Sequence, residues 1–333
     1  MTPWELNKSA VAKTIPSMRY VSGDIGEWRS ATESKLAELL GMDTFTKVSP
    51  ELEIEFDKIT DERREIRFTF KSEEDYRVPC HLCIPLGAEK PLPVVICLQG
   101  HSTGMHISLG NPKYPGDAQT ISGGDRDFCV RVVKEGWCAL AVEQRNFGEC
   151  GGTEKGPDCL MGSLTSIIRG RTTIGERVWD VMRAIDVLEE SFADIVDSSD
   201  IVCMGNSGGG TSTFYIGCLD KRIKCTMPSC AFCSYDDSII AMRHCSCNYI
   251  PGARRYFDMG DLAGLIAPRG FIVVAGREDS IFPFKGVATQ FCIASDLYNR
   301  QGASDKLALV VGNGGHRFYA DDAWKVYREM YKL

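Results

Sequence analysis

The chain has 333 residues, 44% of them hydrophobic and 25% charged, a balance typical of a globular protein with a substantial core. Its 38 basic and 45 acidic side chains give a net charge of −7, which argues against a surface for nucleic acid or anionic membranes. The first residues lack the pattern of a signal peptide, and no apolar run is long enough to span a membrane. We therefore expect a cytoplasmic protein, with a trimmed signal peptide as the open alternative.

Residues 1–50 carry a helical pattern in which Trp28, Leu36, Leu39 and Leu40 share one apolar face. Gly41 follows directly and predicts the end of that helix. We interpret this segment as an N-terminal helical arm that packs on the main domain or on a partner subunit. A homodimer formed through the arm is one of these two alternatives.

The rest of the chain, residues 51–333, is expected to form one α/β domain. Residues 52–84 alternate between apolar and polar side chains, which predicts antiparallel strands with a polar outer face. Uninterrupted apolar runs separated by helical stretches then predict a parallel sheet covered on both faces. These runs cover residues 93–98, 137–142, 201–204, 271–275 and 307–311, and the clearest helices cover about 175–190, 285–300 and 321–333.

The fifteen cysteines form an odd-numbered and scattered set, which is typical of a reduced protein. Cys80 and Cys83 lie three residues apart in a predicted strand and should point to opposite faces, so they cannot easily hold one metal ion. We expect neither a metal nor an organic cofactor. The alternative metal site is the group Cys230, Cys233, Cys245 and Cys247, and the role of this group is left open.

Residues 201–210 are typical of a strand that ends in a sharp turn and continues as a helix. Ser207 stands at the turn, and Gly205 and Gly209 flank it where a Cβ atom would collide with neighbouring backbone. Such a turn holds the serine in strained geometry with its hydroxyl exposed. The pattern predicts that Ser207 is a nucleophile and that the N–H of Gly208 begins the helix, where it can stabilise an oxyanion.

A serine nucleophile needs a base and a carboxylate that orients the base. His316 follows the last apolar run in a glycine-rich loop, and Asp279 follows the preceding run, with Glu278 as its rival. The order Ser207, Asp279, His316 places each residue at the carboxyl end of a predicted strand, where open parallel sheets bind ligands. The second oxyanion donor is expected in the loop after residues 94–98, as the N–H of His101 or, less favourably, of Ser102. His101 as the base is the weaker alternative.

On these residues the chain resembles the α/β-hydrolases, and within them the dienelactone-hydrolase and acetyl-xylan-esterase-like branches. The resemblance covers roughly residues 50–333 and implies an eight-stranded, mostly parallel sheet with Ser207, His316 and Asp279 as the catalytic triad. Dienelactone hydrolases have a cysteine where this chain has Ser207, and the acetyl-xylan-esterase Arg-Gly-Gln-Gly pattern is replaced by Arg145-Asn146-Phe147-Gly148. The matched elements are Gln99 to Ser102, Gln144 to Gly148, Gly205 to Gly209, Gly276 to Asp279 and Gly314 to His316.

Arg145 is expected to support the structure by tying its loop to neighbouring carbonyl groups. Residues 230–264 depart from the strand-helix rhythm and are expected to form a lid or pocket wall. The candidate substrate-binding residues are Gln99, Asn206, Tyr235 and His244.

The predicted function is hydrolysis of short-chain or sugar-acyl carboxylic esters, with a small-molecule ester as the partner. An acylaminoacyl or prolyl-oligopeptidase-like amide hydrolase and a catalytically silent scaffold are the alternatives.

Overall fold

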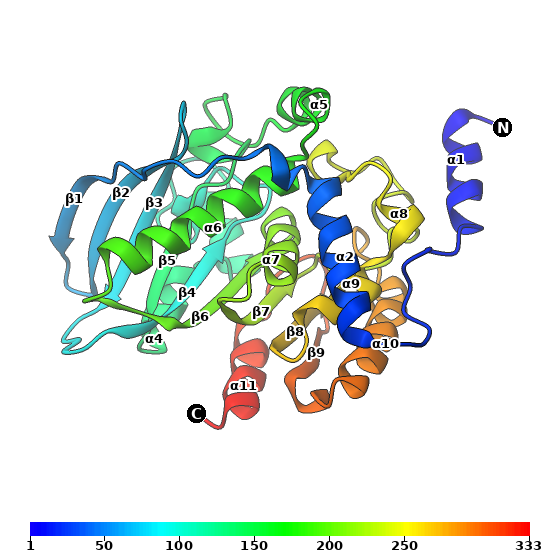
Figure 1. Ribbon diagram of the computed structural model, residues 1–333. Coiled ribbons are helices and arrows are strands. Elements are labelled where there is room, and N and C mark those ends of the chain that lie inside the picture. The colour runs from blue at the N-terminus through cyan, green and yellow to red at the C-terminus, as the bar shows by residue number, and fades with distance from the viewer.

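A nine-stranded sheet crosses the molecule in the order β1-β2-β3-β5-β4-β6-β7-β8-β9 in the computed structural model, which describes residues 1–333 (Figure 1). The strands are β1 (Glu53–Ile59), β2 (Arg63–Glu73), β3 (Tyr76–Pro85), β4 (Leu92–Leu98), β5 (Cys138–Val142), β6 (Val196–Asn206), β7 (Ile223–Ser229), β8 (Gly270–Gly276) and β9 (Leu307–Gly312).

The pairing of the strands confirms the predicted mixed sheet. Strands β1, β2, β3 and β5 pair antiparallel in that order, and β5, β4, β6, β7, β8 and β9 pair parallel. The sheet has nine strands where the resemblance implied eight. Strand β1 lies at the edge of the sheet and pairs only with β2, and most of its side chains are exposed.

Eleven α-helices and five short 3-10 helices connect the strands. The α-helices are α1 (Pro3–Ala12), α2 (Ile25–Leu40), α3 (Asp117–Gly124), α4 (Phe128–Lys134), α5 (Leu160–Ile168), α6 (Thr173–Ser191), α7 (Gly208–Leu219), α8 (Ala253–Tyr256), α9 (Met259–Ile266), α10 (Phe284–Arg300) and α11 (Ala320–Tyr331). The 3-10 helices are η1 (Met42–Thr44), η2 (Met105–Ile107), η3 (Gly148–Cys150), η4 (Ser246–Asn248) and η5 (Ser304–Lys306). The predicted helices at 175–190, 285–300 and 321–333 correspond to α6, α10 and α11.

Helices cover both faces of the sheet because successive side chains of its central strands point to opposite sides. Val94 and Ile96 of β4 join the core that packs under α6, α7, α9 and α10. Val95 and Cys97, the alternate residues, join a second core formed with α4 and α11. Cys80 and Cys83 of β3 belong to different cores, which confirms that they point to opposite faces.

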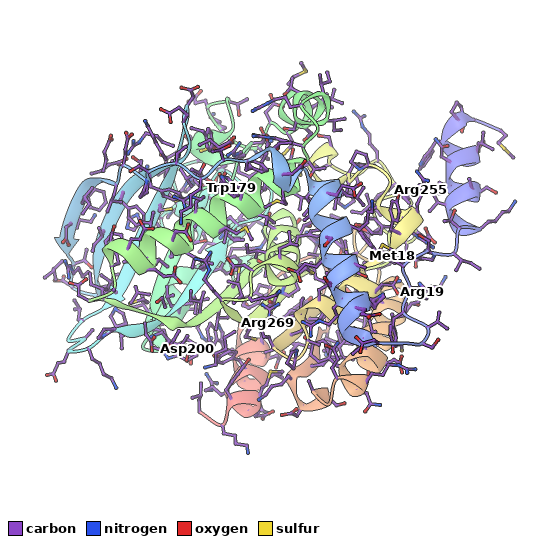
Figure 2. The ribbon with its side chains drawn as sticks, in the orientation of Figure 1. Met18, Arg19, Trp179, Asp200, Arg255 and Arg269 are labelled. Atoms are coloured by element: carbon purple, nitrogen blue, oxygen red, sulfur yellow. The ribbon has the colours of Figure 1, made fainter.

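The N-terminal helices contact the chain in different ways. Helix α2 packs on α6, α7 and α9, buries Leu36 and Leu40, and ends at Gly41 with a φ of 76°. Helix α1 has no buried residue, and its Trp4 Nε1 donates a hydrogen bond to the carbonyl of Ile240 at 3.2 Å. The segment after α1 runs beside α8, where Met18 and Arg255 lie close together (Figure 2). None of the helices combines the length and the apolar character that crossing a bilayer requires.

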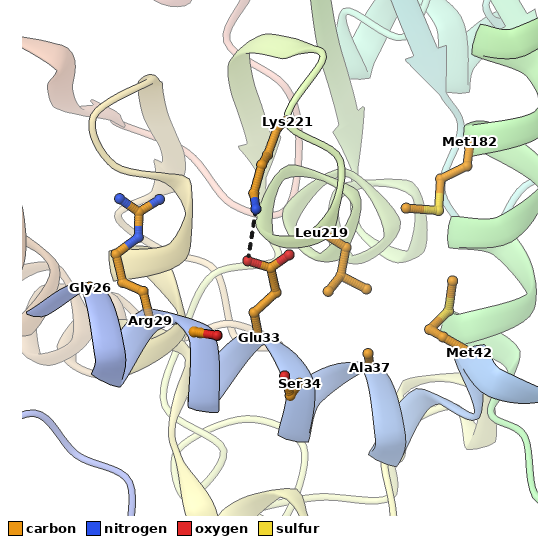
Figure 3. Close-up of a pocket in the computed structure, with 10 residues that line it drawn as sticks. Gly26, Arg29, Glu33, Ser34, Ala37, Met42, Met182, Leu219 and Lys221 are labelled. Carbon is orange, nitrogen blue, oxygen red and sulfur yellow. Dashed lines mark ion pairs between the residues drawn. The ribbon is translucent and has the colours of Figure 1, made fainter.

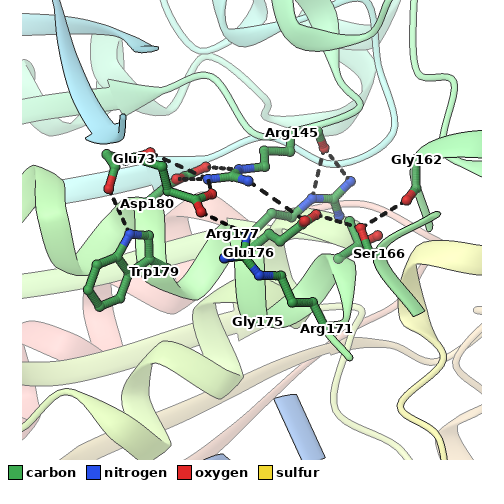
Figure 4. A network of polar contacts seen from close by, with 12 residues as sticks. Glu73, Arg145, Gly162, Ser166, Arg171, Gly175, Glu176, Arg177, Trp179 and Asp180 are labelled. Atoms are coloured by element: carbon green, nitrogen blue, oxygen red, sulfur yellow. Dashed lines mark hydrogen bonds and ion pairs between the residues drawn. The ribbon is translucent and has the colours of Figure 1, made fainter. Parts of the chain in front are cut away.

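Arg145 lies in a buried ionic network between the loop after β5 and helix α6 (Figure 4). Its guanidinium donates two hydrogen bonds of 2.8 Å to the carboxylate of Asp180 and lies 2.7 Å from Glu73. The carbonyl oxygen of Arg145 accepts hydrogen bonds from Arg177. The expected bonds from Arg145 to carbonyl groups are therefore corrected: its partners are carboxylates, whose charges balance a cation withdrawn from water.

Replacing Arg145 with methionine is expected to lower the free energy of unfolding by about 3–5 kcal/mol, because the side chain of Asp180, 2% exposed, would keep its charge without a bidentate partner. The matched control is Arg300→Met. Arg300 pairs with Asp296 on the exposed surface of α10, and its loss should cost less than about 1 kcal/mol. Urea unfolding followed by circular dichroism measures both free energies. Equal losses for the two variants would contradict the stabilising role of the Arg145 ion pairs.

Candidate active site

A cavity of about 650 Å³ lies between α2 and the body of the protein (Figure 3). An ion pair of 3.3 Å between Glu33 and Lys221 crosses it, and none of its lining residues is a histidine or a cysteine. It therefore offers no serine-histidine pair. A smaller cavity of about 410 Å³ lies at the carboxyl edge of the sheet and is lined by both Ser207 and His316.

Ser207 stands at the turn between β6 and α7 with φ 57° and ψ −124°. A non-glycine residue at positive φ is strained and persists only where its surroundings hold it. Two close approaches of backbone provide that hold. A Cβ atom on Gly205 would lie 2.6 Å from the carbonyl oxygen of Leu98, and one on Gly209 would overlap the same oxygen. The glycines thus allow the end of β4 to pack directly against the turn that presents Ser207.

His316 and Asp279 are joined by a hydrogen bond of 2.9 Å between Nδ1 and Oδ2. Asp279 follows β8 and is buried, whereas its neighbour Glu278 is exposed and makes no contact with the imidazole. The ring of His316 also stacks on Phe282, with centroids 6.0 Å apart and planes inclined by 17°. These contacts fix the imidazole and leave Nε2 without a hydrogen-bond partner in the chain.

The carboxylate of Asp279 is held in its ionised form. Burial raises the pKa of Asp279, but the hydrogen bond and charge of His316 and the N–H groups of Ile281 and Phe282 outweigh burial and bring that pKa below its ordinary value. The two N–H groups donate to Oδ1 at 2.8 and 3.1 Å. Oδ2 is thereby left for His316, so the ionised carboxylate can accept a hydrogen bond from Nδ1–H and stabilise a positive imidazole.

Two backbone N–H groups beside Ser207 have no acceptor within the chain: those of His101 and Gly208. Gly208 is the first residue of α7, and His101 follows the end of β4. A Cβ atom on Gly208 would lie only 2.9 Å from Cε1 of His101, which shows how closely the two residues approach. Unsatisfied donors at a helix N-terminus are suited to an anionic oxygen.

Of the four candidate substrate-binding residues, only His244 lines the cavity. The amide nitrogen of Gln99 is buried and donates to Ser108 and to the carbonyl of Arg126. Asn206 is fully buried, and the hydroxyl of Tyr235 bonds to that of Tyr215 in the core. The expected substrate contacts of Gln99, Asn206 and Tyr235 are therefore corrected, because the packing of the protein already encloses these side chains.

The cavity carries positive charge from two arginines that sequence reasoning missed. Arg126 is buried, pairs with no carboxylate and has an unsatisfied Nε, and Arg243 lies exposed at the mouth without an ion pair. Burial lowers the pKa of His244 to about 4, so this ring is neutral at pH 7. A buried guanidinium without a counter-ion favours an anionic ligand. A lone arginine in a loop gives no periodic signal in the sequence.

A second cavity of about 550 Å³ adjoins the first and shares His101, Arg243, His244 and Cys245 with it. Its far wall is apolar and consists of Leu160, Leu164 and Ile167 of α5. The segment 242–249, after β7, lines both cavities. Together the two cavities offer a charged compartment at Ser207 and an apolar one farther out.

Glu143 connects the loops on either side of the cavity. Its Oε2 accepts the N–H of Met105, in the loop after β4, at 3.1 Å and the N–H of Glu149, in the loop after β5, at 3.3 Å. Burial raises the pKa of the Glu143 carboxyl to about 7, although both N–H groups oppose that rise. The carboxyl group is thus protonated in the folded protein over a pH range in which it would be ionised in the unfolded chain.

Glu143→Gln is expected to flatten the dependence of stability on pH. Because the folded pKa is raised, the wild-type protein loses stability as pH rises from about 4.5 to about 7, by roughly 3 kcal/mol from this residue. Glutamine stays neutral and can place its oxygen where Oε2 accepts both N–H groups. Unfolding curves at pH 5 and pH 8 measure the difference, with exposed Glu62→Gln as the control. If the stability of Glu143→Gln depended on pH as strongly as that of the wild type, the raised pKa of Glu143 would not be the cause of this dependence.

All fifteen cysteines are free thiols, and those in the predicted strands are buried, as expected. The group Cys230, Cys233, Cys245 and Cys247 does not come together. Cys230 Sγ lies against the carbonyl of Arg317, and Cys233 Sγ against that of Pro283. Cys245 and Cys247 instead lie with Cys159 and His101, a combination that sequence reasoning missed.

No protein-family model matches the chain. Among curated proteins it is similar to "Putative hydrolase YtaP" of Bacillus subtilis (strain 168), with 26% identity over 247 residues that cover 72% of this chain and 78% of YtaP. Among solved structures it is similar to a "putative acetyl xylan esterase" from Bacteroides fragilis NCTC 9343, with a TM-score of 0.78 and 17% identity over 99% of this chain and 89% of the other.

A glucuronoyl esterase from Solibacter usitatus superposes with a TM-score of 0.68 and 15% identity, over 96% of this chain and 98% of the other. At sequence identities of 15–17%, these similarities are evidence for a shared fold and not for a shared activity. Together with the sheet order, they show that this chain has the α/β-hydrolase fold.

Proposed function

We propose that the protein is a serine hydrolase that cleaves carboxylic esters, with Ser207 as nucleophile, His316 as base and Asp279 as the group that orients the base. The observation that carries the proposal is the placement of strained Ser207 and of His316, hydrogen-bonded to Asp279, on the wall of one cavity. The similarity to a protein named as a hydrolase and to structures named as esterases supports it.

The proposed reaction is acyl transfer to water. Nε2 of His316 takes the proton of the Ser207 hydroxyl as Oγ attacks the ester carbonyl, and the N–H groups of Gly208 and His101 receive the oxyanion. His316 then protonates the leaving alcohol, and the acyl group remains on Oγ. In the second half, His316 deprotonates a water molecule that attacks the acyl-enzyme, and the acid and free Ser207 are released.

The lining of the cavities supports a substrate of moderate size with an anionic group near the scissile bond. Arg126 and Arg243 supply positive charge beside Ser207, and the apolar wall of α5 accepts a less polar part. Short-chain and sugar-acyl esters remain the proposed class, and structures named as acetyl xylan and glucuronoyl esterases share the fold. Within that class we propose a preference for esters that carry a carboxylate.

A panel of esters tests this function. It contains p-nitrophenyl acetate, acetylated sugars, a lactone, a peptide amide, and pairs of esters that differ only by a carboxylate. We expect ester turnover, with the lower KM for the charged member of each pair. Cleavage of the amide alone would favour a peptidase. A fluorophosphonate probe should label Ser207, and absence of both labelling and turnover would favour a silent scaffold.

Two further proposals concern the setting of the protein. The fifteen free thiols favour a reducing compartment such as the cytoplasm.

The exposed helix α1, with Trp4 53% exposed, favours an arm that contacts a second copy of the chain. Light scattering of the full chain and of a chain without residues 1–13, which keeps the packed helix α2, tests the dimer, and the shorter chain should not form it.

A further inference from the structure

Four potential metal ligands from three separate loops meet beside the active-site cavity. The side chains of His101, Cys159, Cys245 and Cys247 place one ligand atom each so that all four atoms lie within 4.8 Å of one another. Sγ of Cys247 lies 3.3 Å from Sγ of Cys245 and 3.3 Å from Nε2 of His101. Ligand atoms around a tetrahedral zinc ion with bonds near 2.3 Å are about 3.8 Å apart, so the cluster has the dimensions of such a site.

The charge around the cluster favours thiolates over neutral thiols. Arg177 is 1% exposed and forms no ion pair with a carboxylate. Its guanidinium donates to the carbonyl of Arg145 at 3.0 and 2.8 Å, stacks on Phe147, and approaches Sγ of Cys159 at 3.8 Å. A buried cation requires an anionic partner. Three thiolates and one divalent ion carry one net negative charge, which Arg177 would balance.

We propose that His101, Cys159, Cys245 and Cys247 bind a zinc ion that holds together the loops around the active site. Three thiolates and one imidazole are a ligand set typical of structural zinc, and four protein ligands leave no open position on the ion. On binding, the three thiols release their protons to solvent, and three Zn–S bonds and one Zn–N bond form.

Because its ligands come from three different loops, the ion would connect these loops. Cys159 precedes α5, Cys245 and Cys247 belong to the segment after β7, and His101 follows β4. The segments of His101 and Cys245 line both cavities, and the segment of Cys159 lines the cavity of about 550 Å³. Because the backbone N–H of His101 is a proposed oxyanion donor, the ion would hold that donor through the side chain of the same residue. This last consequence rests on the proposed function, whereas the zinc site itself does not.

Metal analysis of the full chain, purified under reducing conditions, tests the site. We expect one zinc per chain in the wild type and in Ser207→Ala, which separates metal binding from catalysis. Cys159→Ser, Cys245→Ser and Cys247→Ser should each lose most of the metal. Cys292→Ser is the matched control, since Cys292 is an exposed thiol outside the cluster and its variant should keep the metal.

Cobalt substitution tests the site in the wild-type protein and therefore does not depend on whether the cysteine variants fold. Co²⁺ bound to wild-type protein should give the strong visible bands of a tetrahedral site and near-ultraviolet absorption from thiolate ligands. Folded, reduced wild-type protein that retains no zinc after incubation and dialysis, and shows no thiolate absorption with Co²⁺, would overturn the proposal. A disulfide between Cys245 and Cys247 found by mass spectrometry in protein kept reduced would also overturn it.

Discussion

Replacing Ser207 with alanine is expected to lower kcat for p-nitrophenyl acetate by about 10⁴-fold or more, because no acyl-enzyme can form without its hydroxyl. Alanine differs from serine only by the missing hydroxyl oxygen and adds no bulk at Cβ, so the turn between β6 and α7 should persist. The residual rate would come from the N–H groups of His101 and Gly208 and from substrate positioning, which the substitution leaves in place. Initial rates under saturating ester, with titrated enzyme, measure the loss.

Ser212→Ala is the matched control for this experiment. Ser212 is buried one turn farther along α7, does not line the cavity, and donates to the carbonyl of Gly208 at 3.2 Å. We expect its loss to change kcat by less than about tenfold, because it removes one neutral hydrogen bond. If both variants retained wild-type turnover, Ser207 could not be the nucleophile. If both lost it equally, the effect of Ser207→Ala would reflect damage to α7.

Local patterns in the sequence were sufficient to predict the sheet. They were also sufficient to predict that Asp279 and His316 lie close to each other. Uninterrupted apolar runs such as 93–98, separated by helical stretches, are typical of strands in a parallel sheet covered on both faces, and the structure confirms this arrangement. Parallel strands end at the same edge, so residues directly after β8 and β9 had to lie near each other. The bond between His316 and Asp279 follows from that geometry.

Contacts between irregular loops could not be predicted in the same way. Cys159 is separated from Cys245 by a long stretch of chain that includes the two strands β6 and β7, and no periodicity connects the two loops that carry them. Cys230 and Cys245 were grouped in the alternative metal site because both lie in one thiol-rich segment, but closeness in the chain does not fix the direction of a side chain in a loop. Tyr235 was wrongly assigned for the same reason, since an aromatic side chain after a strand can equally turn into the core.

Asp279→Asn is expected to lower kcat by about 10⁴-fold while leaving the free energy of unfolding much less affected. The N–H groups of Ile281 and Phe282 both donate to Oδ1, so an asparagine would place its oxygen there and direct its NH₂ group toward His316. Nδ1 would then have to accept a hydrogen bond, and the proton of the neutral imidazole would move to Nε2. A protonated Nε2 cannot take the proton of the Ser207 hydroxyl, so the variant would keep its geometry and lose its base.

Glu278→Gln separates this explanation from a general effect of negative charge near the imidazole. Glu278 is adjacent in sequence but exposed, and it makes no contact with His316, so its variant should keep kcat within about twofold. The rate of Asp279→Asn should recover in part at alkaline pH, because hydroxide can replace the missing base in deprotonating Ser207. Equal rates for Asp279→Asn and Glu278→Gln would show that the carboxylate of Asp279 does not determine which nitrogen of His316 carries the proton.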